Sequence, residues 1–162
     1  MSYPTVVESI EIAAPANLIY GLLTDVARMG EWSPEATGAR VKFTGRAPKV
    51  GDTFTGTNKR GFVVWWTQCT VSVARAPTKF EFIVERKPLR ISTWTYELRA
   101  KGAMTVVTEA WTDNRQGPVG LLIKGLGQLI IAGSRPDHNR RNMKATLSAL
   151  KVTAERAAQT AE

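Results

Sequence analysis

The chain has 162 residues, close to the size of one ordinary domain and too short for two domains that each bury a substantial core. Hydrophobic residues make up 43% and charged residues 22%. Both values are typical of globular proteins, which excludes a fibrous chain and a chain disordered along its whole length. We therefore expect residues 1–162 to form a single domain.

The chain is basic, with 22 Lys and Arg residues against 14 Asp and Glu residues and a net charge of +8. Residues 135–156 carry six basic and two acidic side chains, which is half of this excess. A solvated helix face is the simplest interpretation of that segment. A surface for nucleic acid, a surface for anionic membrane and steering of an acidic ligand are the alternatives.

The cysteine content and the first twelve residues indicate the cellular compartment. The single cysteine, Cys69, excludes an internal disulfide and a multi-cysteine zinc or iron–sulfur site. Residues 1–12 lack a basic segment followed by a long apolar run, which a secretory signal requires. We expect a cytoplasmic protein.

The first elements are a strand and two short helices. Residues 5–13 contain a strand pattern that ends before Pro15. A helix after Pro15 is indicated by apolar residues at i, i+4 and i+8, which are Leu18, Leu22 and Val26. This pattern breaks near Gly30, and a second short helix or turn ends by Pro34, which disfavours helix in the residue before it.

Residues 39–114 change to a period of two, with turn residues at regular intervals that leave room for six strands. Along 62–74 the odd positions are the more apolar ones, as a half-buried antiparallel strand requires. Phe82 and then Trp94 and Tyr96 continue the alternation. One face of the predicted sheet is therefore rich in aromatic side chains.

Two further segments follow the strands. Residues 117–133 are apolar with five glycines, and we expect a buried or lid-like helix that gates entry to the interior. A long C-terminal helix begins near Ser134 and Asp137, which resemble a capping box. Its apolar stripe includes Met143, Leu147 and Leu150.

This order of elements predicts an α+β helix-grip fold. A curved antiparallel sheet of about seven strands would wrap around the long C-terminal helix, with two short helices after strand one. Four segments also resemble the START/Bet v 1-like (SRPBCC) superfamily, especially its bacterial polyketide cyclase/dehydrase-like members. They are SIEIAAPANLIYGLLTDVARMGEWSPE (9–35), GDTFTGTNKRG (51–61), the tract from Trp94 to Glu109, and ATLSALKVTAE (145–155).

The resemblance implies a single helix-grip ligand-binding domain over residues 1–162, with a hydrophobic cavity between sheet and helix. Superfamily members use such cavities for lipids, sterols, polyketides and plant hormones. We expect a cavity of roughly 300–1,000 Å³, the usual scale of ligand sites. The candidate ligand-binding residues are Trp32, Asn58, Trp65, Phe80, Phe82, Trp94, Tyr96, Glu109, Trp111, Arg115, Met143, Leu147 and Leu150. Packing of the aromatic residues in the core is the competing interpretation.

Glu109 and Tyr96 are the candidate catalytic residues. If Glu109 points inward, burial raises its pKa and it can act as an acid or base. If it points outward, it is a surface carboxylate near Arg99. The only histidine, His138, is expected to be exposed at the start of the last helix, with no sequence-evident partner for a catalytic triad.

No cofactor and no metal are expected, because phosphate-loop and dinucleotide motifs are missing and one histidine and one cysteine are too few ligands. We predict binding of a small hydrophobic molecule, such as a lipid, polyketide or aromatic compound, and leave cyclase or dehydratase activity open. The alternative is a basic module for nucleic acid or anionic membrane. Nucleic acid is the less expected partner, and the basic C-terminal helix is a candidate for transient contact with anionic membrane. The sequence names neither the ligand, the pathway nor the oligomeric state.

Overall fold

The structure is a computed structural model that describes residues 5–87, 89–115, 122 and 135–160. The predicted gating segment 117–133 lies outside the described residues apart from Leu122, and so does the predicted cap Ser134. The elements are β1 (Val6–Ile12), α1 (Ala16–Thr24), the 3-10 helix η1 (Val26–Glu31), β2 (Ala36–Val41), β3 (Thr53–Arg60), β4 (Val63–Arg75), β5 (Lys79–Arg86), β6 (Leu89–Lys101), β7 (Met104–Asp113) and α3 (Arg135–Gln159).

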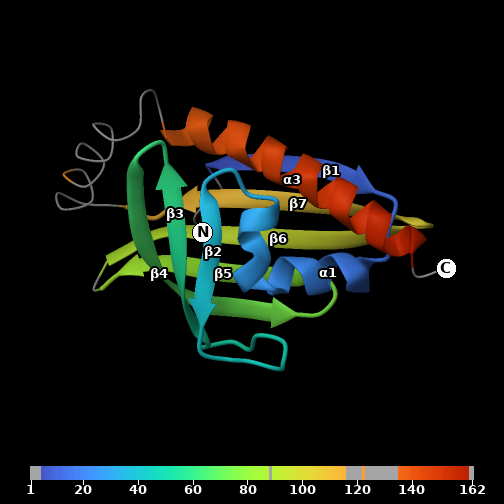
Figure 1. The fold of residues 1–162 in the computed structure, drawn as a ribbon, viewed down its shortest axis with the longest axis horizontal. Helices are drawn as coiled ribbons and strands as arrows, with labels where there is room; N and C mark the ends of the chain where they lie inside the picture. Colours follow the sequence, from blue (N-terminus) through green and yellow to red (C-terminus); the bar gives the residue numbers. More distant parts are fainter. Residues whose placement is uncertain (1–4, 88, 116–121, 123–134, 161–162) are drawn as a thin grey trace.

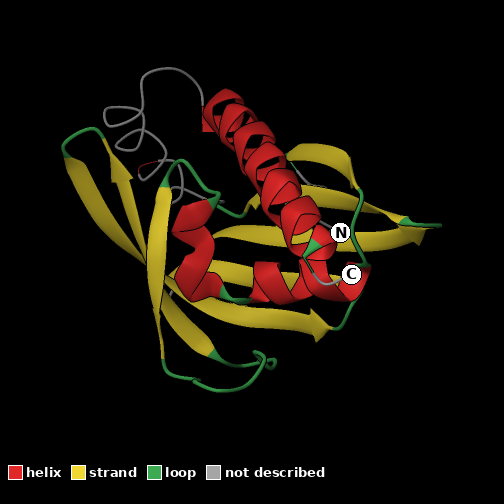
Figure 2. Ribbon diagram, turned by 45° about the vertical axis from the view of Figure 1, so that its right-hand side comes forward, coloured by secondary structure: helices red, strands yellow, loops and turns green. Residues whose placement is uncertain are grey.

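The seven strands form one antiparallel sheet in the order β1-β7-β6-β5-β4-β3-β2. Each strand pairs with its neighbour along the chain, except that β1 pairs with β7. The strands curl around one side of α3, and α1 and η1 lie beside that helix inside the curl (Figures 1 and 2). The predicted helix-grip fold, with its two short helices after strand one, is confirmed.

The register of β6 against β7 determines which face each side chain occupies. Tyr96 lies opposite Glu109, and Trp94 lies opposite Trp111. Directly opposed residues of antiparallel strands point to the same face of the sheet. Along β7 the buried positions alternate, at Thr105, Val107, Glu109 and Trp111. Glu109 therefore faces inward, toward α3.

A solid apolar core fills one part of the space between sheet and helices. It includes Ile12 and Ile19 from the N-terminal elements, Phe80 from β5, and Leu147 and Leu150 from α3. All five side chains are fully or almost fully buried. Hydrophobic burial of this kind is the main stabilising contribution to the fold.

The basic residues of α3 are largely paired within the protein. Arg140 lies 3.1 Å from Glu8 of β1, and Lys144 lies 4.0 Å from the same carboxylate. Lys151 lies 3.1 Å from Glu155. Lys151 also donates to the backbone carbonyl of Glu11 at 2.7 Å, so Arg140, Lys144 and Lys151 all attach α3 to β1. Among the described residues, no helix is long and apolar enough to cross a membrane.

Candidate functional site

A cavity of about 940 Å³ lies between the sheet and the first half of α3. Its walls are mostly apolar and aromatic, with a few polar side chains from β3, β6, β7 and α3. Its volume falls within the range of small-molecule sites. The sequence-predicted residues that line it are Asn58, Trp65, Phe82, Trp94, Tyr96, Glu109, Arg115 and Met143.

The other five predicted residues are buried elsewhere, and the described lining of the cavity does not include them. Phe80, Leu147 and Leu150 belong to the solid core, as does Trp32 beside η1. Trp111 packs with Val6 and Met143 in a separate apolar cluster. The apolar pattern marks the inward face of an element but does not show where along that element the core gives way to a cavity.

The buried pair Tyr96–Glu109 is the first polar feature of the cavity wall. The Tyr96 hydroxyl donates a hydrogen bond of 2.8 Å to Oε1 of Glu109, whose side chain is 2% exposed. Burial raises the pKa of Glu109 to about 8, against the smaller lowering effect of the Tyr96 hydrogen bond. Burial first, and then the Glu109 charge, also raise the pKa of Tyr96 well above its usual value.

Glu109 consequently carries a proton at neutral pH. Its Oε1 accepts the Tyr96 hydroxyl, so the proton resides on Oε2. Within the described part of the chain, this Oε2 atom is buried and has no hydrogen-bond partner. Glu109 lines the cavity and thus keeps a buried donor that no described residue satisfies.

Asn139 supplies a second free donor. It is 1% exposed, lines the same cavity from α3, and its Nδ2 atom finds no partner among the described residues. An unsatisfied buried donor costs about 1–3 kcal/mol. Two residues that line one cavity and each keep an unsatisfied donor favour a ligand with acceptor atoms.

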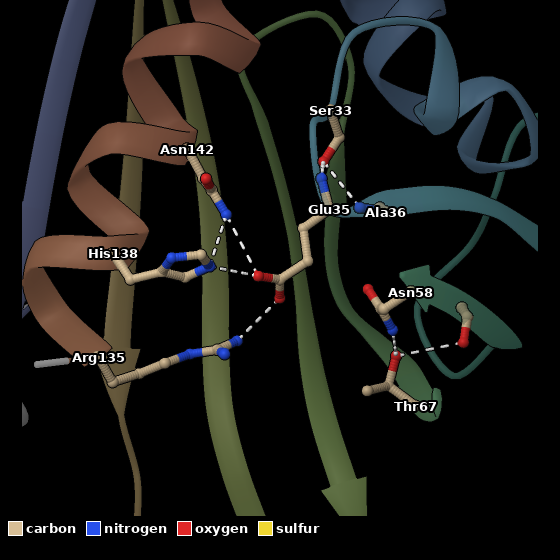
Figure 3. A network of polar contacts seen from close by, with 9 residues as sticks. Ser33, Glu35, Ala36, Asn58, Thr67, Arg135, His138 and Asn142 are labelled. Carbon is tan, nitrogen blue, oxygen red and sulfur yellow. Dashed lines mark hydrogen bonds and ion pairs between the residues drawn. The ribbon is translucent and has the colours of Figure 1, made fainter. Parts of the chain in front are cut away.

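Two other polar side chains of the wall, Asn58 and Arg115, already have partners within the protein. Asn58 donates to the Thr67 hydroxyl at 3.2 Å, and Arg115 binds both carboxylate oxygens of Asp113 at 2.9 and 2.8 Å. Figure 3 shows the Asn58–Thr67 contact apart from the polar residues of α3. These groups shape the wall, whereas Glu109 and Asn139 retain unused donors.

Sequence reasoning missed a second polar cluster, which joins the start of β2 to the first turns of α3 (Figure 3). The Glu35 carboxylate lies 3.1 Å from Arg135 and 2.5 Å from Nε2 of His138, and it accepts a hydrogen bond of 3.2 Å from Asn142. The Ser33 hydroxyl accepts the backbone N–H of Ala36 at 3.0 Å, which shapes the turn that carries Glu35.

The expectation that His138 is exposed is wrong, because the residue is buried against Glu35. The two residues are 103 positions apart, so local sequence contains no sign of the contact. The sequence contained two weak signals of this cluster. They are the aspartate beside His138 and the spacing that places Arg135, His138 and Asn142 on one helix face.

Cys69 is not a reactive thiol. It is buried, and burial raises its pKa to about 12, so the thiol stays protonated. Nucleophilic thiolate chemistry therefore has no support at this position. The chemistry that the cavity wall can supply is hydrogen-bond donation and proton transfer by Glu109, held by Tyr96.

Comparison with known proteins gives one family and several structural relatives. The family described as polyketide cyclase / dehydrase and lipid transport matches residues 3–155. No functionally curated protein matches the chain significantly.

Among solved structures, the polyketide-cyclase-like protein Cgl2372 from Corynebacterium glutamicum is 29% identical, with a TM-score of 0.60 over 93% of this chain and 91% of that one. A START superfamily protein from Mycobacterium smegmatis is 13% identical, with a TM-score of 0.62 over 97% and 98% of the two chains. The di-domain ARO/CYC protein StfQ of the steffimycin biosynthetic pathway is 13% identical, with a TM-score of 0.67 over 94% of this chain and 45% of StfQ. The last two likenesses show a shared fold.

Proposed function

The chain belongs to the polyketide cyclase/dehydrase and lipid-transport family, and from this premise we propose that its cavity binds a small, mostly apolar molecule with an acceptor oxygen. One observation carries the proposal. A cavity of about 940 Å³ with mostly apolar walls is lined by Glu109 and Asn139, and each of these residues keeps a buried donor, Oε2 and Nδ2, without a partner among the described residues.

The apolar walls and the two donors make different contributions to binding. Burial of the ligand's apolar surface supplies affinity, at roughly 25 cal/mol for each Å² removed from water. The donors supply selectivity, because a ligand oxygen offsets the cost of leaving them unsatisfied and a hydrocarbon does not. The relative StfQ comes from the steffimycin biosynthetic pathway, and the family description includes polyketides, so aromatic ketones are suitable first probes.

Native mass spectrometry of gently purified protein tests for a co-purified small molecule. Titration calorimetry then compares 2-acetylnaphthalene with 2-ethylnaphthalene, which have nearly the same shape and differ by the carbonyl oxygen. We expect the ketone to bind about tenfold more tightly, as two hydrogen bonds of ordinary net strength provide.

Variants identify the donors. Asn139→Leu is expected to reduce the ketone preference to about threefold, because one hydrogen bond is lost. Asn17→Leu on α1, an exposed asparagine, is the matched control and leaves the preference unchanged. Equal binding of the two probes would refute the role of the donors, and binding of neither probe would count against the whole function.

A second candidate function, cyclase or dehydratase catalysis, is favoured by the Tyr96–Glu109 hydrogen bond. The neutral Glu109 can protonate a carbonyl or leaving hydroxyl oxygen as a general acid, and Tyr96 acts as a positioning residue through its bond to Oε1. The pKa of Glu109, about 8, keeps the acid form available at neutral pH.

Once a substrate is found, Glu109→Gln should lower kcat by about 100-fold. Tyr96→Phe should move the falling limb of the pH–rate profile to higher pH. The Tyr96 hydrogen bond lowers the pKa of Glu109, so its removal raises that pKa. If both variants keep full kcat, Glu109 and Tyr96 do not carry the catalysis. If ligands bind and no substrate turns over, the protein is a carrier.

A further inference from the structure

The tip of the β3–β4 hairpin is apolar and exposed. Phe62 is wholly exposed, Trp66 is largely exposed, and Val63 and Val64 are each about half exposed. Gly61 has a φ of 56°, a left-handed conformation that suits glycine and makes the turn tight. Successive strand residues point to opposite faces, so both faces of β4 are apolar at its start. We call Phe62, Val63, Val64 and Trp66 the hairpin tip.

The hairpin tip forms one edge of the cavity. Val63, Val64 and Trp66 contribute to the cavity lining, together with Arg86 and Lys87 from the end of β5. The β3–β4 turn lies at the left-hand end of the molecule in Figures 1 and 2, away from the C-terminal end of α3. An exposed apolar cluster of this kind usually marks an interaction site.

Positive charge surrounds the hairpin tip. Lys59 lies opposite Val64 across the β3–β4 pair. The pairing of Gln68 with Glu85 brings the end of β5, with Arg86 and Lys87, beside β4 near Trp66. All three bases are exposed, and none forms an ion pair within the described residues.

We propose that the hairpin tip docks on an anionic lipid bilayer, with Phe62, Trp66 and the two valines entering the interface and Lys59, Arg86 and Lys87 contacting lipid headgroups. Aromatic rings favour the membrane interface, and basic side chains beside them are attracted by anionic lipid. The proposal goes beyond ligand binding and does not require that the ligand be known.

The same features disfavour other partners. Single-stranded nucleic acid binds to aromatic rings, which Phe62 and Trp66 provide, but the half-exposed Val63 and Val64 between them favour an apolar partner. In a symmetric dimer through the hairpin tip, the bases of one copy would face those of the other at short range, which is unfavourable. The basic residues of α3 are less suited to a membrane than the hairpin, because Arg140, Lys144 and Lys151 contact Glu8 and Glu155.

Vesicle flotation tests the proposal with the full chain. Phosphatidylcholine vesicles with roughly 30% phosphatidylglycerol are compared with pure phosphatidylcholine vesicles at about 0.1 M NaCl. We expect at least about tenfold tighter binding to the anionic vesicles. Phe62→Ser with Trp66→Ser should weaken that binding about tenfold or more, because two aromatic side chains no longer enter the interface.

Charge-reversal variants distinguish the hairpin tip from α3 as the membrane-binding surface. Arg86→Glu with Lys87→Glu should abolish the preference for anionic vesicles. Arg141→Glu with Arg156→Glu changes the same number of charges at two exposed sites of α3 and should leave binding within about twofold of wild type. Val152→Ser, at an exposed valine of α3, is the matched control for the loss of apolar surface.

The outcomes are distinct. Wild-type levels of vesicle binding by the hairpin variants, or loss of binding only in the α3 double variant, would overturn the proposal. Two other results would also overturn it if the protein does not bind vesicles. One is a dimer in analytical ultracentrifugation that the hairpin variants abolish, and the other is binding of a single-stranded oligonucleotide that these variants abolish. Circular dichroism melting checks the fold of each variant, and Phe62→Ser alone replaces the double variant if that one fails to fold.

Discussion

At Glu109, burial leaves a carboxyl group that keeps its proton near neutral pH. Its neighbours in the sheet register are Glu8 on β1 and Tyr96 on β6. Arg140 and Lys144 of α3 lie beside Glu8 and balance its charge. The shift of the Glu109 pKa therefore follows from burial, which the Tyr96 hydrogen bond only partly offsets.

The stability of the fold should depend on this proton. The pKa of Glu109 is raised from 4.5 to about 8 in the folded protein, so the folded chain holds a proton that the unfolded chain releases above pH 4.5. The contribution of the neutral carboxyl is complete below pH 4.5 and is lost as the pH rises through 8. Glu109→Gln lacks this titration. As the pH rises over that range, we expect the free energy of unfolding of the variant to increase by on the order of 4 kcal/mol relative to that of wild type.

Denaturant unfolding of both proteins from pH 4.5 to 8.5 measures the difference directly. All other titrating groups are shared, so their effects cancel in the comparison. Glu97→Gln, at an exposed carboxylate of β6, is the control for the removal of a carboxylate as such. Parallel curves for Glu109→Gln and wild type would show that Glu109 titrates normally.

At the scale of elements, the Glu35 cluster connects β2 and α3 across the cavity. Glu35 and Glu31 each form a contact with an arginine, at 3.1 and 2.7 Å. The side chain of Glu35 is 13% exposed and that of Glu31 is 48% exposed. The shorter contact should matter less, since water screens an exposed ion pair. Removal of Glu35, in contrast, takes the acceptor away from buried His138 and from the half-buried Arg135 and Asn142.

We therefore expect Glu35→Ala to lower the free energy of unfolding by about 1–3 kcal/mol. Glu31→Ala should lower it by less than about 1 kcal/mol. Urea unfolding at neutral pH measures both values. Hydrogen exchange adds a local readout, with faster exchange expected in the first turns of α3 for Glu35→Ala only. Equal losses from the two variants would contradict this assignment.

At the scale of the whole molecule, the two proposed sites, the apolar cavity and the hairpin tip with its basic neighbours, should differ in their salt dependence. Raising NaCl from about 0.05 to 0.5 M should change the dissociation constant of 2-acetylnaphthalene by less than about threefold, because cavity binding depends on apolar burial. Binding to anionic vesicles should weaken more than about tenfold over the same range. Calorimetry and flotation at matched salt concentrations check both expectations. A steep salt dependence of the ketone would point instead to charge-driven binding.

Much of the architecture follows from local sequence patterns. The period of two over residues 39–114 predicts six strands, and the apolar spacing of Met143, Leu147 and Leu150 predicts the inward face of α3. These patterns work because a strand or helix exposes a fixed face at each repeat, and burial selects apolar residues for it. The alternation also identifies Tyr96 as an inward residue, as the structure shows.

Tertiary structure decided the features that depend on residues far apart in the chain. The inward phase of Glu109 follows from its register with Tyr96, since Val107 and Val106 are apolar on both faces of the same strand. The burial of His138 depends on Glu35, which lies 103 positions earlier in the chain. The distance between the curled sheet and α3 decides where side chains fill the space as a core and where a cavity remains. By itself, the sequence determined the apolar face of each element whose periodicity was unambiguous, such as β6 and α3. The partner of each polar group depended on packing between distant elements, because hydrogen bonds and ion pairs act over a few ångströms and leave no local periodicity.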